Sequence, residues 1–228
     1  MSSHAVNRPR PYDNSGRAAQ ALATRRRVIA AAHELLLEQG YAATTISQIA
    51  RRAGVSAETV YKAFGSKAAL TKQVYDVALA GDDEPVPMRE RPEIQAMLAE
   101  PDPRQKVARY AALARQLGAR LGPLLAVLLG ARATDPDLDA FARTTADERL
   151  VGTTALVGHL ADAGALRPGL DPERARDLLW ALISPELYQL LVVERGWPPE
   201  DYERWLAGAI ADELLDHGHA PAGPAATG

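Results

Sequence analysis

Apolar residues recur three and four positions apart over most of the chain, which is the spacing of an amphipathic helix. The clearest case is the stretch 21–39, and Gly40 follows it as a C-terminal stop. Its apolar stripe consists of Val28, Ile29, Ala32, Leu35 and Leu36. The sequence contains no convincing pair of strand patterns, and alanine and leucine dominate its apolar residues, so we expect an all-α fold.

Capping residues predict three short helices after this one. Thr45 precedes the second helix, and Gln48 stands three residues further on, which completes a capping box. Gly54 follows the end of that helix, and Ser56 and Ser66 can each cap the start of one of the next two. The expected helices are about 21–39, 46–53, 57–64 and 67–80.

Three Asp-Pro pairs predict the starts of long helices downstream, because aspartate caps a helix and proline suits its first position. These pairs are Asp102–Pro103, Asp135–Pro136 and Asp171–Pro172, and the helices would cover about 103–132, 136–163 and 172–195. We expect a break near Gly122–Pro123 and a kink at Pro185. A loop follows Gly81, and a last helix runs from Pro198–Pro199 to about Asp216.

Charge is distributed unevenly along the 228 residues, although the net charge is only −3. Residues 1–72 carry 11 Lys/Arg and 4 Asp/Glu, whereas residues 73–228 carry 15 and 25. A basic head on an acidic body indicates that only the head meets a polyanion.

Composition excludes several other classes. The chain has no cysteine, so it can form no disulfide, zinc–thiolate site or thiol nucleophile. Its first residues hold no apolar segment of a secretory signal, and the apolar run 121–130 is too short to span a bilayer. We therefore expect a cytoplasmic protein with no membrane partner.

The segment 45–64 has the layout of a helix-turn-helix. Gly54 permits the left-handed backbone that the turn needs. The apolar residues that would face inward are Ile46, Ile49, Ala50, Val60 and Phe64. The second helix would then expose a polar face that suits the major groove of DNA, made of Glu58, Thr59, Tyr61 and Lys62.

Over about residues 22–80 the sequence resembles the DNA-binding domain of the tetracycline-repressor (TetR) family. The resemblance rests on RRRVIAAAHELLLEQGYAATTISQIA and AGVSAETVYKAFGSKAAL, in which Val60, Tyr61, Phe64, Ser66, Lys67 and Leu70 fit the family pattern in order. It implies a homodimer that binds a pseudo-palindromic, double-stranded DNA operator and usually represses transcription. It also implies a pocket for a small-molecule effector in the C-terminal part.

The resemblance also implies a division of the all-α chain into an N-terminal three-helix helix-turn-helix domain and a larger C-terminal helical domain for ligand binding and dimerisation. The expected segments are a disordered basic arm (1–20), the helix-turn-helix domain (21–66), a connecting helix (67–80), the ligand-binding and dimerisation domain (81–217) and a flexible tail (218–228).

Roles for the DNA-binding residues follow from their positions. Thr44, Thr45 and Tyr61 are expected to contact phosphate. Lys62 can reach guanine and Thr59 a thymine methyl, whereas Glu58 either accepts from cytosine or excludes wrong partners. The full expected set is Thr44, Thr45, Ser56, Glu58, Thr59, Tyr61, Lys62 and Lys67.

Lys67 stands in the first turn of its helix, where a cation opposes the helix dipole at a cost of about 0.3–1 kcal/mol. A DNA phosphate that bridges Lys67 and the helix N-terminus would reverse the sign. The sequence departs from the family at Ala57 and Ala63, where longer side chains are common. Arginines of the arm, together with Arg25–Arg27, either compensate for the lost contacts or remain solvated.

We expect the ligand pocket among the helices between residues 93 and 190. Its expected lining is Tyr110, Leu113, Leu117, Leu128, Phe141, Thr145, Arg149, His159, Trp180, Ser184 and Tyr188. The last two long helices resemble those that pair across the family's dimer. The expected interface is the stripe Tyr202, Trp205, Leu206, Ala209, Ile210 and Leu214, although the same stripe also fits core packing within one chain.

Two classes of function remain open. The first is a ligand-responsive repressor, and the second is a helical ligand-binding or scaffold protein whose helix-turn-helix no longer functions. An activator with the same DNA mode fits the sequence equally well. The five histidines are scattered, and no nucleophile elbow or phosphate-binding glycine loop is present, so we expect no catalytic residue, metal or cofactor.

Overall fold

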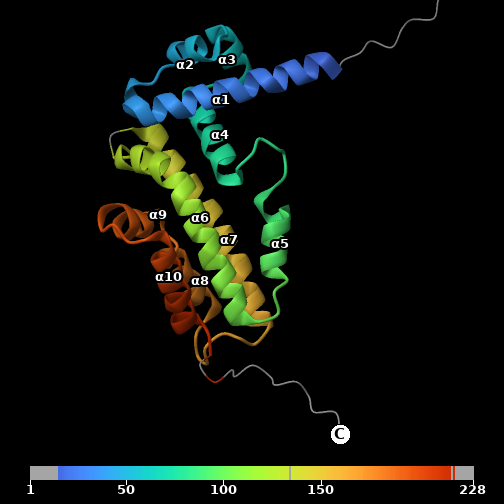
Figure 1. The fold of residues 1–228 in the computed structure, drawn as a ribbon, viewed down its shortest axis with the longest axis vertical. Helices are drawn as coiled ribbons and strands as arrows, with labels where there is room; N and C mark the ends of the chain where they lie inside the picture. The colour runs from blue at the N-terminus through green and yellow to red at the C-terminus, as the bar shows by residue number, and fades with distance from the viewer. Residues whose placement is uncertain (1–14, 134, 217, 219–228) are drawn as a thin grey trace, which may run out of the picture.

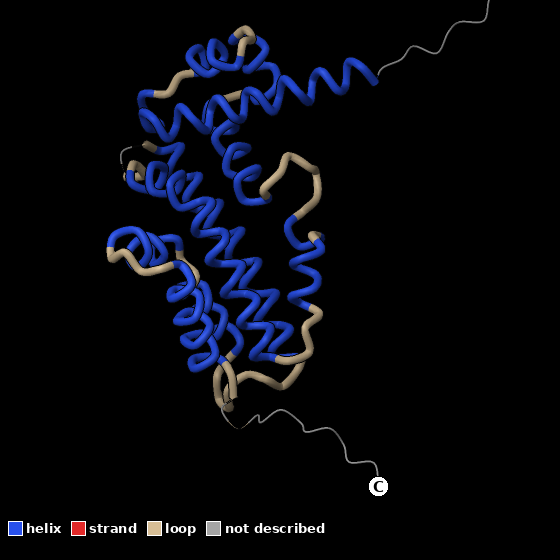
Figure 2. Tube along the Cα trace, in the orientation of Figure 1, coloured by secondary structure: helices blue, strands red, loops and turns tan. Residues whose placement is uncertain are grey.

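Helices form the regular structure of residues 15–133, 135–216 and 218, which are the residues that the computed structural model describes (Figure 2). The prediction of an all-α fold is therefore confirmed. One isolated antiparallel bridge joins Leu166 to Leu215 and ties the segment before α8 to the end of the last helix.

Four helices form the N-terminal end: α1 (Ser15–Ala43), α2 (Ile46–Ala53), α3 (Ala57–Phe64) and α4 (Lys67–Ala80). In Figure 1, α1 crosses the top of the molecule, α2 and α3 lie on its outer side, and α4 descends from it into the body. This arrangement presents α2 and α3 to solvent at one end of the molecule.

The body is built around two long helices that run side by side, α6 (Pro103–Gly130) and α7 (Pro136–Asp162). Figure 1 shows α5 on one flank of this pair, and α8 and α10 on the other. The remaining elements are η1 (Met88–Glu90), α5 (Pro92–Leu98), α8 (Pro172–Leu182), α9 (Pro185–Tyr188), the π-helical η2 (Gln189–Glu194) and α10 (Pro199–Leu214). By length and composition α6 could cross a membrane, but it packs against α1, α4, α7 and α10, as a core helix does.

Two hydrophobic clusters hold the chain together, and the first joins the two parts of the fold. It contains the interior of α1–α4 and continues into Leu121, Leu124 and Leu128 of α6 and Phe141 of α7. We call this cluster the shared core. The second cluster lies within the body and includes Val107, Leu156, Leu179 and the inner face of α10. The helix-turn-helix end therefore has no separate interior of its own.

The first helix is longer than predicted. It begins at Ser15 rather than near Ala21, so residues 15–20 are helical and do not belong to a disordered arm. Residues 1–14 lie outside the described residues, as does the expected tail apart from Gly218. The predicted stop is nevertheless real, because Gly40 has φ 78° and ψ 173° and interrupts the helix before one further turn.

Prolines act differently from the expectation at two places. Helix α6 continues through Pro123 without a break; Pro123 is exposed, and its neighbours Leu121, Leu124 and Leu125 are buried. At Pro185 the chain does not kink but starts a new helix, since Ser184 adopts an extended conformation and caps α9. The segment 92–98, for which we predicted no separate helix, forms α5.

Candidate DNA-binding surface and ligand cavity

The turn between α2 and α3 is fixed by local hydrogen bonds. The side chain of Thr45 accepts from the backbone N–H of Gln48 at 3.2 Å, and the side chain of Gln48 accepts from the N–H of Thr45 at 2.8 Å. Gly54 adopts φ 68° and ψ 39°, a left-handed conformation that a Cβ would strain. The predicted capping box and glycine turn are both present.

Helix α3 is held by its inner face and exposes its outer one. Val60 is fully buried and Phe64 is buried beside it. The side chain of Ser56 accepts from the N–H of Thr59 at 3.1 Å, which caps the helix. The four side chains predicted to face DNA are all exposed, and these are Glu58, Thr59, Tyr61 and Lys62.

Thr44 cannot contact phosphate as we predicted. It is 0% exposed, and its hydroxyl lies 2.7 Å from the carbonyl oxygen of Gly40 and 3.2 Å from that of Leu35. The break at Gly40 turns the chain so that Thr44 faces inward and its exposed neighbour Thr45 faces outward. Sequence position alone did not separate these two threonines.

Lys67 has a different partner from the one predicted. Its ammonium group donates to the carbonyl oxygen of Tyr41 at 2.9 Å and lies 3.9 Å from the centre of the Tyr41 ring. The end of α1 thus supplies the negative partial charge that we had assigned to a phosphate. Arg25 is engaged as well, because it donates to Gln73 at 2.6 Å and to Asp83 at 3.2 Å.

A cavity of about 610 Å³ lies inside the body, within the range of small-molecule sites. Its walls come from α4, η1, α5, α6, α7, α8, α9 and, through Tyr202, α10, and they are mostly apolar. Eight of the predicted lining residues do line it: Tyr110, Leu113, Leu117, Thr145, Arg149, Trp180, Ser184 and Tyr188. Val151 also lines it and is 72% exposed, so the cavity opens to solvent at α7.

Three predicted lining residues lie elsewhere. Leu128 and Phe141 belong to the shared core, where Phe141 packs edge-on against Tyr75 with ring centres 5.3 Å apart. His159 is exposed on α7. Each has the helical spacing of a lining residue, but the side of its helix that meets the cavity depends on the packing of the whole body.

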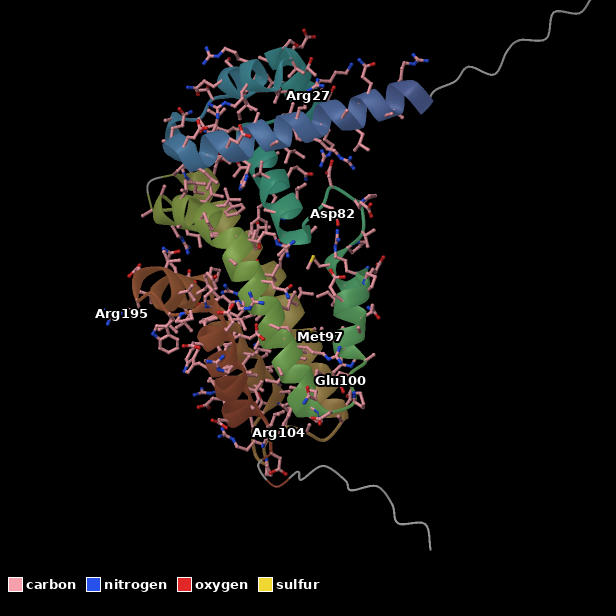
Figure 3. The ribbon with its side chains drawn as sticks, viewed as in Figure 1. Arg27, Asp82, Met97, Glu100, Arg104 and Arg195 are labelled. Carbon is pink, nitrogen blue, oxygen red and sulfur yellow. The ribbon has the colours of Figure 1, made fainter. Side chains whose placement is uncertain are left out.

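Sequence reasoning missed the walls contributed by α4, η1 and α5. These are Tyr75, Asp76, Leu79, Met88, Arg89, Ile94, Met97 and Leu98. Figure 3 labels Met97 on α5, which packs beside α6. The proline pair at 85 and 87 masked the short α5, and the only signal for it was Pro92 at its first position.

The wall at α9 depends on a close approach between helices. A Cβ at Gly118 of α6 would overlap the ring of Tyr188, so only glycine lets the ring lie against the helix. Tyr188 in turn packs edge-on against Tyr202 of α10 at 5.2 Å between ring centres. Burial raises the pKa of Tyr202 to about 12, so its hydroxyl stays protonated at neutral pH.

Most of the predicted dimer stripe is internal. Tyr202, Leu206, Ile210 and Leu214 are at most 1% exposed and pack within the body of one chain. Trp205 and Ala209 are half-buried, and Trp205 packs edge-on against Trp197. The alternative of core packing is therefore correct for these four residues, because α10 turns that stripe toward α6.

An exposed recognition helix after a capped turn, joined to a helical body with a cavity, defines a transcriptional regulator of the helix-turn-helix class. Residues 28–74 match the family model described as bacterial regulatory proteins, tetR family. The helix-turn-helix transcriptional regulator YdeS of Bacillus subtilis (strain 168) is 33% identical over 171 residues, which cover 74% of this chain and 79% of YdeS. The chain belongs to the TetR family.

Solved structures show the same fold. The SmeT–triclosan complex superimposes with a TM-score of 0.66 at 20% identity, over 88% of this chain and 96% of that one. SmeT is the repressor of the Stenotrophomonas maltophilia multidrug efflux pump SmeDEF. NalD, the secondary repressor of the Pseudomonas aeruginosa pump MexAB-OprM, gives 0.63 at 21% identity, over 86% and 99%.

Membership in the family bears on several predictions. TetR-family proteins are transcriptional regulators and not enzymes, so the prediction that this protein is not an enzyme is confirmed. They bind DNA operators, usually as dimers, and usually respond to small-molecule effectors. TetR-family regulators act in the cytoplasm.

Proposed function

We propose that this protein is a homodimeric repressor that binds a pseudo-palindromic operator through α3 and leaves it when a small molecule fills the cavity. The observation that carries this proposal is the double role of α4. Helix α4 follows directly on the recognition helix, and its residues Tyr75 and Leu79 line the cavity. SmeT and NalD, which have the same fold, are both repressors.

The DNA contacts follow from the exposed face of α3. Thr59 and Lys62 read base edges, and Glu58 accepts from cytosine or excludes other bases. Thr45, Ser56 and Tyr61, which are also exposed, contact phosphates around the groove. We assign no phosphate to Thr44, which is buried, and none to Lys67, whose ammonium group is bound to Tyr41.

Dimerisation would use the outward faces of α8 and α10. With Tyr202 and Leu206 turned inward, the surface left for a partner includes Ala181, Trp205, Gly208 and Ala209, of which Trp205 and Ala209 come from the predicted stripe. A two-fold axis there would place the recognition helices about 34–36 Å apart, or slightly more, so that they enter successive major grooves.

A ligand can act on DNA binding because three contacts join the cavity region to α1. The hydroxyl of Tyr41 donates to Asp137 of α7 at 3.1 Å, and Arg25 binds Asp83 of the loop that follows α4. The third contact is the shared core itself. A ligand that prefers one arrangement of α4 by about 1–3 kcal/mol would lower operator affinity to a comparable extent.

Binding to the protein's own promoter region tests the proposal. Footprinting should reveal a two-fold symmetric site, and fluorescence anisotropy should show affinity that falls steeply with salt. The double variant T59A/K62A should lose the footprint while it keeps its fold and its dimer. Failure to bind any duplex at low ionic strength would support the scaffold alternative, and transcription that rises on binding would indicate an activator.

A further inference from the structure

Among the described residues, one cation that lines the cavity, Arg149, makes no ion pair. The side chain of Arg149 reaches the cavity from α7, and the centre of its guanidinium lies 4.3 Å from the centre of the Trp180 ring. Its Nε is shielded from solvent and has no hydrogen-bond partner. Burial lowers the pKa of Arg149, and the carboxylate of Glu186 acts in the opposite direction but forms no ion pair with it.

Most of the other charged groups at the cavity already take part in ion pairs. Asp76 and Glu148 share one partner, the ammonium group of Lys72, at 2.5 and 2.8 Å. Arg89 and Arg132 each pair with a neighbouring carboxylate at the surface. Within the described part of the chain, Arg149 is thus the one cation lining the cavity that makes no ion pair, and Glu186 is the one lining carboxylate that makes none.

Two hydroxyl donors stand near this cation. Tyr75 and Tyr110 are buried, line the cavity and lie within electrostatic range of Arg149. Burial raises the pKa of both phenols, so both keep their protons at neutral pH. Neither hydroxyl makes a hydrogen bond to another described residue, so both can donate to a ligand that enters the cavity.

The rest of the wall is mostly apolar. It consists largely of leucine, methionine and alanine side chains from α4, α5 and α6, such as Leu79, Met97, Leu113 and Leu117. A buried cation is costly unless it is paired, and guanidinium matches the planar geometry of a carboxylate. A molecule that fills this cavity well therefore has one anionic end and an apolar body.

We propose that the effector is an amphipathic monoanion, whose carboxylate binds Arg149 with Tyr75 and Tyr110 while its apolar body lies along the leucines of α4 and α6. This inference rests on the proposed function, because it names the chemical class of the ligand for the same cavity. Arg149 is the lining cation that is free to pair with one carboxylate, and the aliphatic wall specifies a hydrocarbon partner.

Calorimetry with decanoate and decanol, two probes of equal chain length, tests this assignment on the free protein. Hydrogen bonds to charged groups favour decanoate by roughly tenfold to hundredfold in affinity. In R149M the preference for decanoate disappears while decanol still binds. In R149K the preference is intermediate, because lysine keeps the positive charge but lacks the planar guanidinium. R104M is the matched control, since Arg104 is exposed at the far end of α6 (Figure 3).

Each other outcome has a defined meaning. Equal affinities for decanoate and decanol, no binding of either, or a preference that survives in R149M would overturn the assignment. Operator release is then measured separately. If decanoate binds with the expected preference but leaves DNA binding unchanged, the ligand class stands and the proposed release mechanism fails. If another ligand releases DNA without an anionic group, the ligand class fails alone.

Discussion

The substitution Thr44→Val separates a structural role of this side chain from a role in DNA contact. Valine has nearly the shape of threonine but cannot donate, so the carbonyl oxygens of Gly40 and Leu35 would lose their shared hydroxyl partner. A buried acceptor without a partner costs about 1–3 kcal/mol. For a chain of this length, each kcal/mol lowers Tm by about 2–4 °C. We therefore expect clear destabilisation of T44V.

The assay compares stability with DNA binding in the same variant. Guanidinium unfolding at a fixed protein concentration should give the loss of free energy, and anisotropy with the footprinted duplex should give an unchanged salt slope. Thr144→Val is the matched control, because Thr144 is exposed and also donates to a carbonyl of its own helix. A T44V protein of normal stability with weak DNA binding and a shallower salt slope would refute the reasoning.

Three further substitutions test the turn, the recognition helix and the loop after α4. Gly54→Ala should lower the free energy of unfolding by about 1–2 kcal/mol, because Gly54 has a left-handed backbone that a Cβ strains. Gly158→Ala is the control and should not destabilise the protein, because Gly158 is exposed within a helix. Urea unfolding measures both variants. Lys62→Ala should weaken operator binding by about 1–3 kcal/mol and relax specificity at one base, with little effect on a scrambled duplex in a mobility-shift assay. The hydrogen bond from Arg91 lowers the pKa of Asp82 from 3.8 to about 2, so this pair stabilises the fold above pH 3.8 and loses its effect as pH falls toward 2. Asp82→Asn should therefore lower the unfolding midpoint by a constant amount near neutral pH, and the difference should shrink in acid.

The helix-turn-helix was predictable because its signals are local. The capping box at Thr45, the left-handed turn at Gly54 and the exposed polar face of α3 each depend on residues within one or two turns. The starts of α6, α7 and α8 at their Asp-Pro pairs follow for the same reason. Eight of the eleven proposed lining residues also line the cavity.

Failures occurred where distant packing decides the outcome. An apolar stripe such as that of Tyr202 and Leu206 has the same spacing whether it meets its own chain or a partner, and here α6 covers it. The hydrogen-bond partner of Lys67 is Tyr41 near the end of α1, which is 26 residues away in sequence. Pro185 ends a helix because Ser184 can cap a new one, a choice that the proline alone does not determine.

The shared core bears on how this architecture can be recombined. Because Leu121, Leu124 and Leu128 complete the interior beneath α1, a fragment ending at Ala80 would expose the apolar underside of its helices to water. A chimera that joins this helix-turn-helix domain to the ligand-binding domain of a relative must therefore also include the C-terminal part of α6 and the start of α7 from this protein. Otherwise the corresponding residues of the relative must match their side-chain volumes. The DNA-binding helices form one continuous segment of the sequence. In three dimensions, however, the unit that could be exchanged between proteins extends well past the end of α4.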